Sequence, residues 1–242
     1  MALHALGYAA GHDNSAMTSA ALEGVAALSH LGVIRAEGAD AATFLHGQLT
    51  QDFALLDASQ ARLAALCTPK GRMIASFVAI RPEPEVILLV CSRDILPATL
   101  KRLQMYVLRA KAKLSDASAA FALYGLAGAA LAANGVDAEA APGRSSAIGD
   151  ARAISLYPAD GTARALWIAP AGAPAPTGAS MDTSLWQWGD VRSGVATLTV
   201  PVLDAFVPQM LHYESVGGVN FKKGCYPGQV VVARSQFRGT VI

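Results

Sequence analysis

The residue types with the clearest chemical potential lie together in the stretch Lys222-Lys223-Gly224-Cys225-Tyr226-Pro227-Gly228-Gln229. Proline is favoured in the first turn of a helix, because its N–H is not needed there and its φ is already helical. The stretch therefore predicts that Cys225 lies at or just before a helix N-terminus. The partial positive charge of that helix end, with Lys222 and Lys223 nearby, would favour a thiolate over a thiol. Cys225 is thus a candidate reactive sulfur.

The sequence leaves other interpretations of this cysteine open. A lone Cys in an apolar, glycine-rich stretch also suits a small buried hydrophobe. The three consecutive valines at 230–232 also suit a strand, in which case the helix argument lapses. Finally, Cys225 and His212 could act as a nucleophile and its base if the fold brings them together.

Three blocks of the sequence carry a resemblance to one family. Phe221 to Gln229, followed by Val232-Ala233-Arg234 and Arg238-Gly239, resembles the YgfZ family of folate-binding, iron–sulfur-related proteins. That family is similar to the T-protein, the aminomethyltransferase of the glycine cleavage system. The other blocks, in the order of the family, are Gly38, Asp40 and Phe44 to Asp52 with Lys70 to Met73, and Asp190 to Gly194 with Phe206 to Gln209. The sequence departs from the family at Val230, where Glu is usual, and stops at Ile242, where the family normally continues.

The resemblance implies an α+β fold of two interleaved lobes with antiparallel sheets and helices. It also implies that a C-terminal β-barrel module is mostly absent from this chain. We expect residues 1–17 to form a flexible N-terminus and residues 18–242 to form the T-protein-like folate-binding region. Pairs of strands that alternate with helices in the two halves agree with this class.

Periodicity and turn residues predict the individual elements. Helices are expected at 22–28, 40–45, 96–107 and 184–191, and in an alanine-rich segment that ends at 135. Strands are expected at 32–35, 62–67, 73–80, 86–90, 119–124, 153–157 and 166–168. Asp40 would cap its helix, and Pro158-Ala159-Asp160-Gly161 would form a hairpin turn. Residues 141–149 and 170–178 are expected to be loops.

The resemblance also implies a central pocket for tetrahydrofolate or a related reduced folate. Flat rings stack on aromatic faces, so Trp188 and Tyr226 are candidates for its walls. The candidate cationic partners of the polar or anionic parts of the cofactor are Lys70, Arg72, Arg192 and Lys223. Arg grips carboxylates with two N–H groups and Lys supplies a point charge, so the pair in the 68–72 turn would suit the folate glutamate tail. An ordinary solvated turn explains the same two charges.

By the resemblance, the chain is a folate-binding accessory protein. It would act in the synthesis, maintenance or repair of iron–sulfur clusters and iron–sulfur enzymes, tRNA-modifying enzymes among them, with Cys225 close to the folate. The alternative is an aminomethyltransferase or another one-carbon transfer enzyme. The T-protein carries a pair of aspartates where this sequence has Ala75 and Ser76, and an Asp where this sequence has Cys225. This sequence therefore lacks the carboxylates that an aminomethyltransferase needs near the substrate amine. A third interpretation is a binding module whose cysteine is structural.

The net charge and the cysteine count limit the kinds of partner that the sequence predicts. With 19 basic and 18 acidic residues the formal charge is +1, which favours neither a nucleic-acid binder nor a membrane-surface protein. The three cysteines, Cys67, Cys91 and Cys225, form no CxxC pair, so we expect no disulfide framework, no zinc site and a cytoplasmic protein. Three thiolates are fewer than the four that usually hold an iron–sulfur cluster. We therefore expect folate and iron–sulfur client proteins as partners, with no direct nucleic acid and no membrane.

One segment, 101–113, is strongly basic although the chain as a whole has balanced charge. The cations Lys101, Arg102, Arg109, Lys111 and Lys113 follow one another with no acidic residue between them. Such a row could meet RNA or another anionic partner. A solvated face, with favourable charge at a helix C-terminus, explains it equally simply and is the interpretation that we adopt from the sequence.

Overall fold

The computed structural model of the chain describes residues 21–238, so the expected flexible segment 1–17 lies outside the described residues. The chain forms two five-stranded sheets in which every paired strand is antiparallel. Sheet A has the order β1 (Gly24–Ala27), β7 (Phe121–Ala127), β10 (Thr162–Pro170), β9 (Ala151–Ala159) and β8 (Ser145–Ile148). Sheet B has the order β3 (Ala61–Cys67), β4 (Met73–Glu83), β5 (Val86–Ser92), β2 (Leu31–Glu37) and β6 (Lys113–Asp116). The expected α+β class with antiparallel sheets is confirmed.

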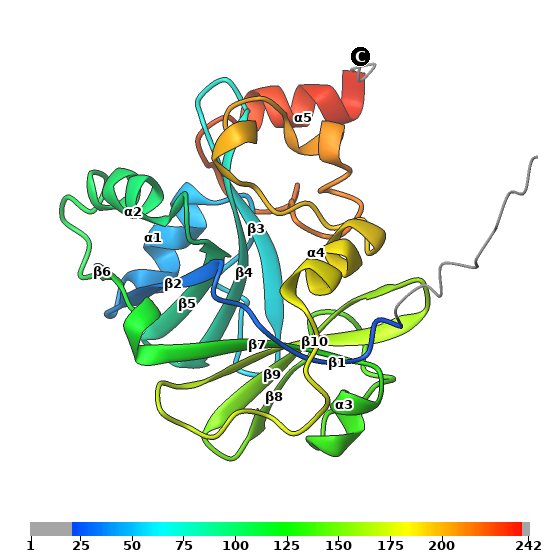
Figure 1. The fold of residues 1–242 in the computed structure, drawn as a ribbon. Coiled ribbons are helices and arrows are strands. Elements are labelled where there is room, and N and C mark those ends of the chain that lie inside the picture. The colour runs from blue at the N-terminus through cyan, green and yellow to red at the C-terminus, as the bar shows by residue number, and fades with distance from the viewer. Residues whose placement is uncertain (1–20, 239–242) are drawn as a thin grey trace, which may run out of the picture.

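Helices are few and short. The α-helices are α1 (Ala41–Gln48), α2 (Leu96–Gln104), α3 (Ala129–Ala133), α4 (Thr183–Arg192) and α5 (Gln229–Arg238), with 3-10 turns η1 (Ser118–Ala120), η2 (Val200–Val202) and η3 (Pro208–Leu211). Figure 1 shows sheet A below sheet B, with α5 at the top beside the β3–β4 turn. Within residues 21–238 no helix combines the length and the apolar composition that a membrane crossing requires.

The two sheets interleave along the chain. β1 starts in sheet A, the chain then builds all of sheet B, and it returns to complete sheet A with β7 to β10. After α4 the chain goes back to sheet B, where Leu198, Tyr213, Val219 and Val232 join the core that also holds α1 and α2. Each lobe is therefore assembled from segments far apart in the sequence, as the two-lobe expectation required.

Strand β5 shows why the sheets stack as they do. All seven of its residues are buried. Because successive side chains in a strand point to opposite faces, Ile87, Leu89 and Cys91 enter the core with α1 and α2. Val86, Leu88 and Val90, which alternate with them, face the second core, and sheet A shares that core. A strand that is apolar on both faces fits only between two packed layers.

Most expected strands are confirmed, and the β9–β10 hairpin turns at Asp160 and Gly161, both with positive φ, as a two-residue turn of this kind requires. Two expectations were wrong. Within residues 22–28 the chain forms the four-residue strand β1 (Gly24–Ala27) instead of a helix, because Gly24 has φ +113° and the strand pairs with β7. The expected loop 141–149 contains β8, which pairs with β9.

Helix boundaries also differ from expectation. The Asp40 carboxylate does not cap α1 but accepts a hydrogen bond from the Lys111 N–H, and α1 continues through Gly47. α2 ends at Gln104, before Val107. The valines at 230–232 lie in α5, so the strand alternative was wrong, and α5 begins only at Gln229.

The three resembling blocks meet where the β3–β4 turn packs against the start of α5. Gly228 has φ +82°, and a β-carbon there would lie 2.4 Å from the Thr68 carbonyl oxygen and 2.8 Å from the Gly71 α-carbon. Nearby, the Met73 N–H donates to the Phe206 carbonyl at 2.8 Å. Glycine at 228 is thus required both by its backbone angle and by the close approach.

We expect Gly228→Ala to lower the free energy of unfolding by about 3 kcal/mol, because a left-handed alanine adds to a clash with the β3–β4 turn. The matched control is Gly172→Ala, which has φ +85° but open space around its β-carbon position. It should lose about 1 kcal/mol. Urea unfolding of both variants measures the difference, and equal losses would show that the contact contributes nothing.

Candidate functional site

A central pocket lies between the two sheets. Its apolar walls come from Leu63, Val78 and Val90 of sheet B and from Leu156 and Leu166 of sheet A. The cavity at its centre has a volume of about 90 Å³. The two sheets therefore leave a narrow slot instead of a fully packed interface.

Two larger hollows adjoin this slot and share lining residues with it. One of about 490 Å³ is reached past the segment 190–197, which lines both spaces. The other, of about 380 Å³, shares Leu63, Val78, Leu156 and Tyr157 with the slot. Ligand pockets commonly hold about 300–1,000 Å³. The volume of each neighbouring hollow falls in that range, whereas the volume of the slot alone does not.

A buried guanidinium forms the polar floor of the slot. Arg164 of β10 is only 2% exposed, yet it lies in a strand that is otherwise mostly apolar. It donates to the Gly189 carbonyl at 3.2 Å and to the Asp190 carboxylate. Its guanidinium carbon lies 4.0 Å from the ring centroid of Trp186. Arg164 Nε is buried and has no hydrogen-bond partner within residues 21–238, and a β-carbon at Gly189 of α4 would lie 3.3 Å from it.

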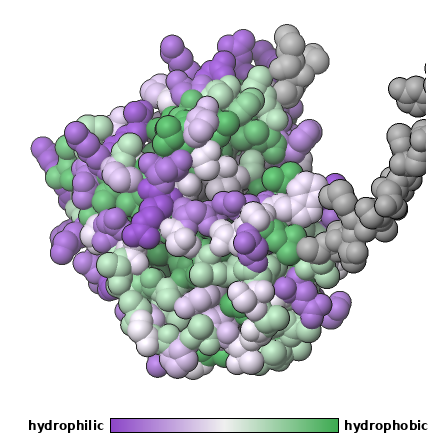
Figure 2. Space-filling model, viewed as in Figure 1, coloured by the Kyte–Doolittle hydropathy of each residue, from purple (hydrophilic) through white to green (hydrophobic). Residues whose placement is uncertain are grey.

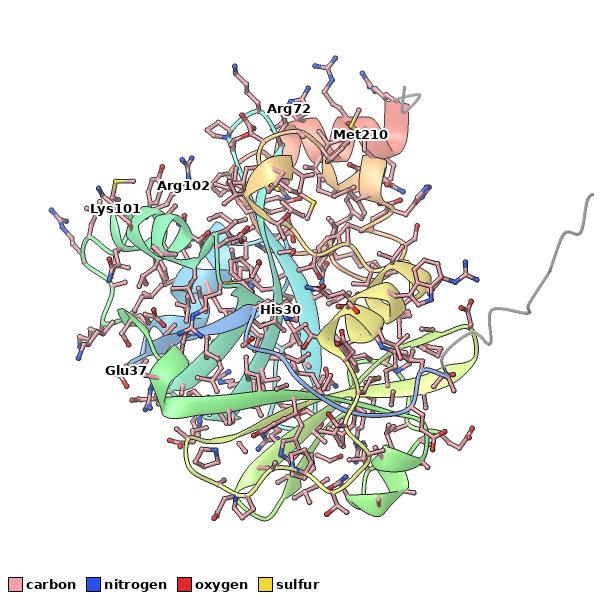
Figure 3. All side chains as sticks on the ribbon, viewed as in Figure 1. His30, Glu37, Arg72, Lys101, Arg102 and Met210 are labelled. Carbon is pink, nitrogen blue, oxygen red and sulfur yellow. The ribbon has the colours of Figure 1, made fainter. Side chains whose placement is uncertain are left out.

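Asp190 and His30 are the titratable neighbours of this floor. Burial raises the pKa of Asp190, while the Arg164 guanidinium and His30 oppose the rise. Burial lowers the pKa of His30, against the attraction of the Asp190 charge. His30 Nδ1 is buried without a partner among the described residues. Figure 3 shows His30 near the centre of the molecule, between the two sheets. The carboxylate and the guanidinium line the slot, and the imidazole of His30 lines the adjoining hollow of about 490 Å³.

A second cluster surrounds Lys223. This side chain is 8% exposed and donates to the His46 carbonyl and, at 2.7 Å, to the Leu49 carbonyl. Those carbonyls close the C-terminal end of α1, where the helix leaves acceptors unpaired and its dipole favours a cation. Lys223 therefore joins the 221–229 segment to the end of α1, within the block 44–52, and has a structural role.

Cys225 lies next to this cluster. Its side chain is exposed, whereas Cys67 and Cys91 are buried and burial raises the pKa of each of those thiols to about 12. The interpretation of Cys225 as a buried hydrophobe was therefore wrong. The expected helix N-terminus is also absent there, because α5 begins four residues later, at Gln229.

The imidazole of His46 faces the cysteine segment. A β-carbon at Gly224 would lie 3.6 Å from His46 Nε2, and His46 Nδ1 lies 3.3 Å from the Asp52 carboxylate. Asp52 also accepts the N–H groups of the two residues at 54 and 55. No local pattern singles out His46, since 177 residues separate it from Lys223.

The structure separates the residues that the sequence suggested as one folate site. Trp188 is 53% exposed on α4 and does not line the central slot. Arg192 is exposed as well and pairs with Asp160, with Nε 2.7 Å from Oδ2. Its guanidinium lies 5.5 Å from the Trp188 ring centroid. Trp188 and Arg192 thus interact with each other and with the β9–β10 turn instead of facing the slot.

The other suggested residues are also outside the slot. Tyr226 is buried with its ring 4.8 Å from Lys223 Nζ, and its hydroxyl has no partner within residues 21–238. Lys70 is exposed at the β3–β4 turn. Arg72 donates to the Ala205 carbonyl, and Figure 3 shows it at the top of the molecule. Among the lining residues of the slot and its two neighbours, the arginines are Arg164 and Arg62.

Sequence reasoning missed Arg164, Trp186 and Tyr157 as slot residues, and it quoted Asp190 only as part of a block. One signal was present, namely a single arginine directly before the apolar run at 165–169. A charge at such a place must be paired or bound, since an isolated buried charge is costly. Within residues 21–238, His, Cys, Asp and Glu side chains form no group of three or more that could hold a metal ion.

We expect Lys223 to make stability depend on pH. Burial lowers its pKa to about 8, below the value of about 10.4 that an unfolded chain gives lysine. Between these values the unfolded chain binds more protons, so the free energy of unfolding should rise with pH. Lys223→Met should remove this rise and the exposed Lys222→Met should keep it, as measured by urea unfolding across the window. An unchanged slope in Lys223→Met would contradict the burial of a charged lysine.

Comparison with known proteins gives three kinds of result. No family model matches the chain. A curated protein of Haemophilus influenzae, described as uncharacterized, is 29% identical over 213 residues, which cover 88% of this chain and 68% of that protein. The tRNA-modifying protein YgfZ of Edwardsiella ictaluri is 33% identical over 217 residues, covering 85% of this chain and 65% of the relative. The YgfZ of Vibrio vulnificus strain YJ016 is 28% identical over 227 residues, covering 89% and 66%.

Among solved structures, the aminomethyltransferase T of the glycine cleavage system from Bartonella henselae superposes with a TM-score of 0.66. Its sequence is 18% identical, and the match covers 89% of this chain and 63% of that one. This likeness shows the fold. The chain spans about two thirds of the length of the curated relatives that it matches. The chain is thus similar to the YgfZ proteins over most of its own length and shares the fold of aminomethyltransferase T.

Proposed function

We propose that the chain binds a reduced folate and acts as an accessory protein of the YgfZ type. In this role it supports the synthesis, maintenance or repair of iron–sulfur enzymes, among them enzymes that modify tRNA. The observation that carries folate binding is the buried Arg164–Asp190 pair beside Trp186, in a slot between two sheets. The name of the relatives, tRNA-modifying protein YgfZ, supports the cellular role. The three free cysteines agree with a cytoplasmic location, which is part of the proposal.

The residues of the slot suit the chemistry of a pterin. A pterin is a flat ring with N–H donors along one edge, and the second carboxylate oxygen of Asp190 accepts no hydrogen bond from residues 21–238. The Arg164 guanidinium gives the slot a polar floor, and the aromatic side chains of Trp186 and Tyr157 are among its lining residues. When bound, a reduced folate supplies ring nitrogens that carry one-carbon units. The slot residues would hold and orient the ring and exclude water from it.

The folate tail needs a cation at an opening of the slot. Lys70 and Arg72 are not among the lining residues, whereas Arg62 lines the hollow of about 380 Å³. Its Nη1 donates to the Asp52 carbonyl, which fixes the guanidinium at the mouth of that hollow. Arg62 is therefore our candidate partner for the glutamate carboxylates. In this arrangement the tail would leave the slot toward the loop that carries Gln51.

Transfer of an aminomethyl group has less support. An enzyme of that kind needs a carboxylate near the developing ammonium. The positions that resemble the aspartates of the T-protein hold Ala75 and Ser76, both buried in β4, and the Ser76 hydroxyl accepts the Leu198 N–H at 2.9 Å. Asp190 is the carboxylate of the slot, and Arg164 already neutralises it. The accessory role therefore agrees better with the residues present.

We expect tetrahydrofolate to bind, and Asp190→Asn to weaken binding about 10- to 100-fold, because hydrogen bonds to a charged acceptor are lost. Calorimetric titration checks this, with thermal melting to confirm that the variant folds. Tyr157→Ala, whose side chain reaches the slot from β9, is a second variant that spares the buried ion pair and should also weaken binding. Trp188→Ala and Arg192→Ala are controls that should bind as the parent does. Weakening by the controls alone would place the folate on the outer face of α4.

We assign a chemical role in the proposed function to the exposed thiol of Cys225. In a bacterial strain that lacks its own YgfZ protein, the chain should restore the tRNA nucleoside modifications that the strain has lost, measured by mass spectrometry, and Cys225→Ser should restore few of them. Cys67→Ser, which removes a buried thiol that lines neither the slot nor its two neighbouring hollows, is the matched control and should behave as the parent does. Full restoration by Cys225→Ser would exclude a chemical role for this thiol.

A further inference from the structure

A row of cations follows α2 and continues into β6. From Arg109 to Lys113 the chain alternates, with Arg109, Lys111 and Lys113 exposed and the alanines at 110 and 112 packed on the core. Two residues of chain span at most about 7 Å, so the three charges follow one another at short intervals on the outer side. Lys101 and Arg102 in the last turn of α2 extend the positive charge. We call these five residues, with the exposed side chains between them, the α2–β6 surface.

Exposed apolar and aromatic side chains lie within the same surface. Leu108 is 85% exposed, Met105 58% and Tyr106 47%. Large apolar side chains gathered among cations are a sign of a binding surface rather than of a purely solvated face. Figure 2 shows hydrophobic and hydrophilic residues side by side at the left edge, where Figure 1 places α2. Figure 3 shows Lys101 and Arg102 on the outside of that helix.

The segment is held in place although its side chains are exposed. The Asp40 carboxylate accepts the Lys111 N–H at 2.7 Å, and the Asp40 N–H donates to the Lys111 carbonyl at 3.1 Å. Gln104 Nε2 donates to the Leu114 carbonyl at 3.0 Å. A binding surface that is fixed in advance loses little conformational freedom when it meets its partner.

Two carboxylates lie beside the row. Asp40 accepts the Lys111 N–H, and Glu37 lies 3.9 Å from Lys113 Nζ and also pairs with Arg35. Within residues 21–238 the other four cations of the row form no salt bridge. Four of the five cations are therefore available to an anionic partner, which the sequence alone did not establish.

We propose that the α2–β6 surface binds RNA, with the cations on successive phosphates and Tyr106 stacked on a base. A polyanion with one charge per nucleotide matches cations that follow one another along the surface, and bases stack on exposed aromatic rings in single-stranded segments. This revises our expectation of no direct nucleic acid. The identification of the RNA as tRNA rests on the proposed function, whereas the charge and stacking argument does not.

The test measures fluorescence anisotropy of a labelled, unstructured RNA oligonucleotide and, separately, of a tRNA transcript. The parent chain should bind both at low salt. Arg109→Glu with Lys111→Glu should weaken binding at least tenfold and lower the slope of log affinity against log salt by about 1.4, since two phosphate contacts are lost. Tyr106→Ala should weaken binding of the oligonucleotide about tenfold. Melting curves and the folate titration on the same variants, expected unchanged, show that each folds.

The matched control is Arg144→Glu with Arg238→Glu, which makes the same change of charge beside β8 and at the end of α5. It should bind RNA within about a factor of two of the parent when both are measured at about 0.15 M salt, since exposed charges more than about 8 Å apart are then largely screened. Equal weakening in both double variants would overturn the proposal, as would absence of binding at low salt. Binding of anionic phospholipid vesicles that depends on the row, with no binding of RNA, would also overturn it. Folate binding that fails while RNA binding persists would refute the proposed function alone.

Discussion

The structure depends on one guanidinium that is buried between two sheets. Arg164 needs a counter-charge, because an unpaired charge in that place is costly. Asp190 supplies it from α4, so the ion pair sets where α4 lies against sheet A. Removal of one partner from such a pair typically costs about 3–5 kcal/mol. The second carboxylate oxygen of Asp190 accepts no hydrogen bond from residues 21–238, so the ion pair that holds α4 on sheet A also supplies a polar group to the slot.

Lys223 has a similar role in the other half of the molecule. Its buried ammonium joins the end of α1 to the segment that carries Cys225, across 177 residues of sequence. The thiol is exposed while the lysine beside it is not. The position of Cys225 is therefore set by a buried cluster and not by a helix dipole. In both halves a buried cation holds together segments that are distant in the sequence. The Arg164 contact lies at the slot, and the Lys223 contact lies beside Cys225.

The strands and the class of fold could be predicted well, because alternation of apolar residues and turn residues are local signals. Arg192 could not be placed, since its partner Asp160 lies 32 residues away on a turn. The segment 22–28 was predicted as a helix because its apolar pattern is too short to separate helix from strand, and only pairing with β7 decided between them. Arg164 was missed because its importance depends on burial between two sheets, which no local pattern reveals. The resemblance identified Asp190 as part of a block but not its role.

A reduced folate between the sheets, against Arg164, Asp190 and Trp186, is the central element of the proposed function. A crystal structure of the chain grown with tetrahydrofolate tests it most directly. We predict electron density for the pterin in the slot, with its N–H edge on the Asp190 carboxylate and its tail directed toward Arg62. Density for the pterin on the outer face of α4 beside Trp188 and Arg192, with a slot filled only by water, would contradict it.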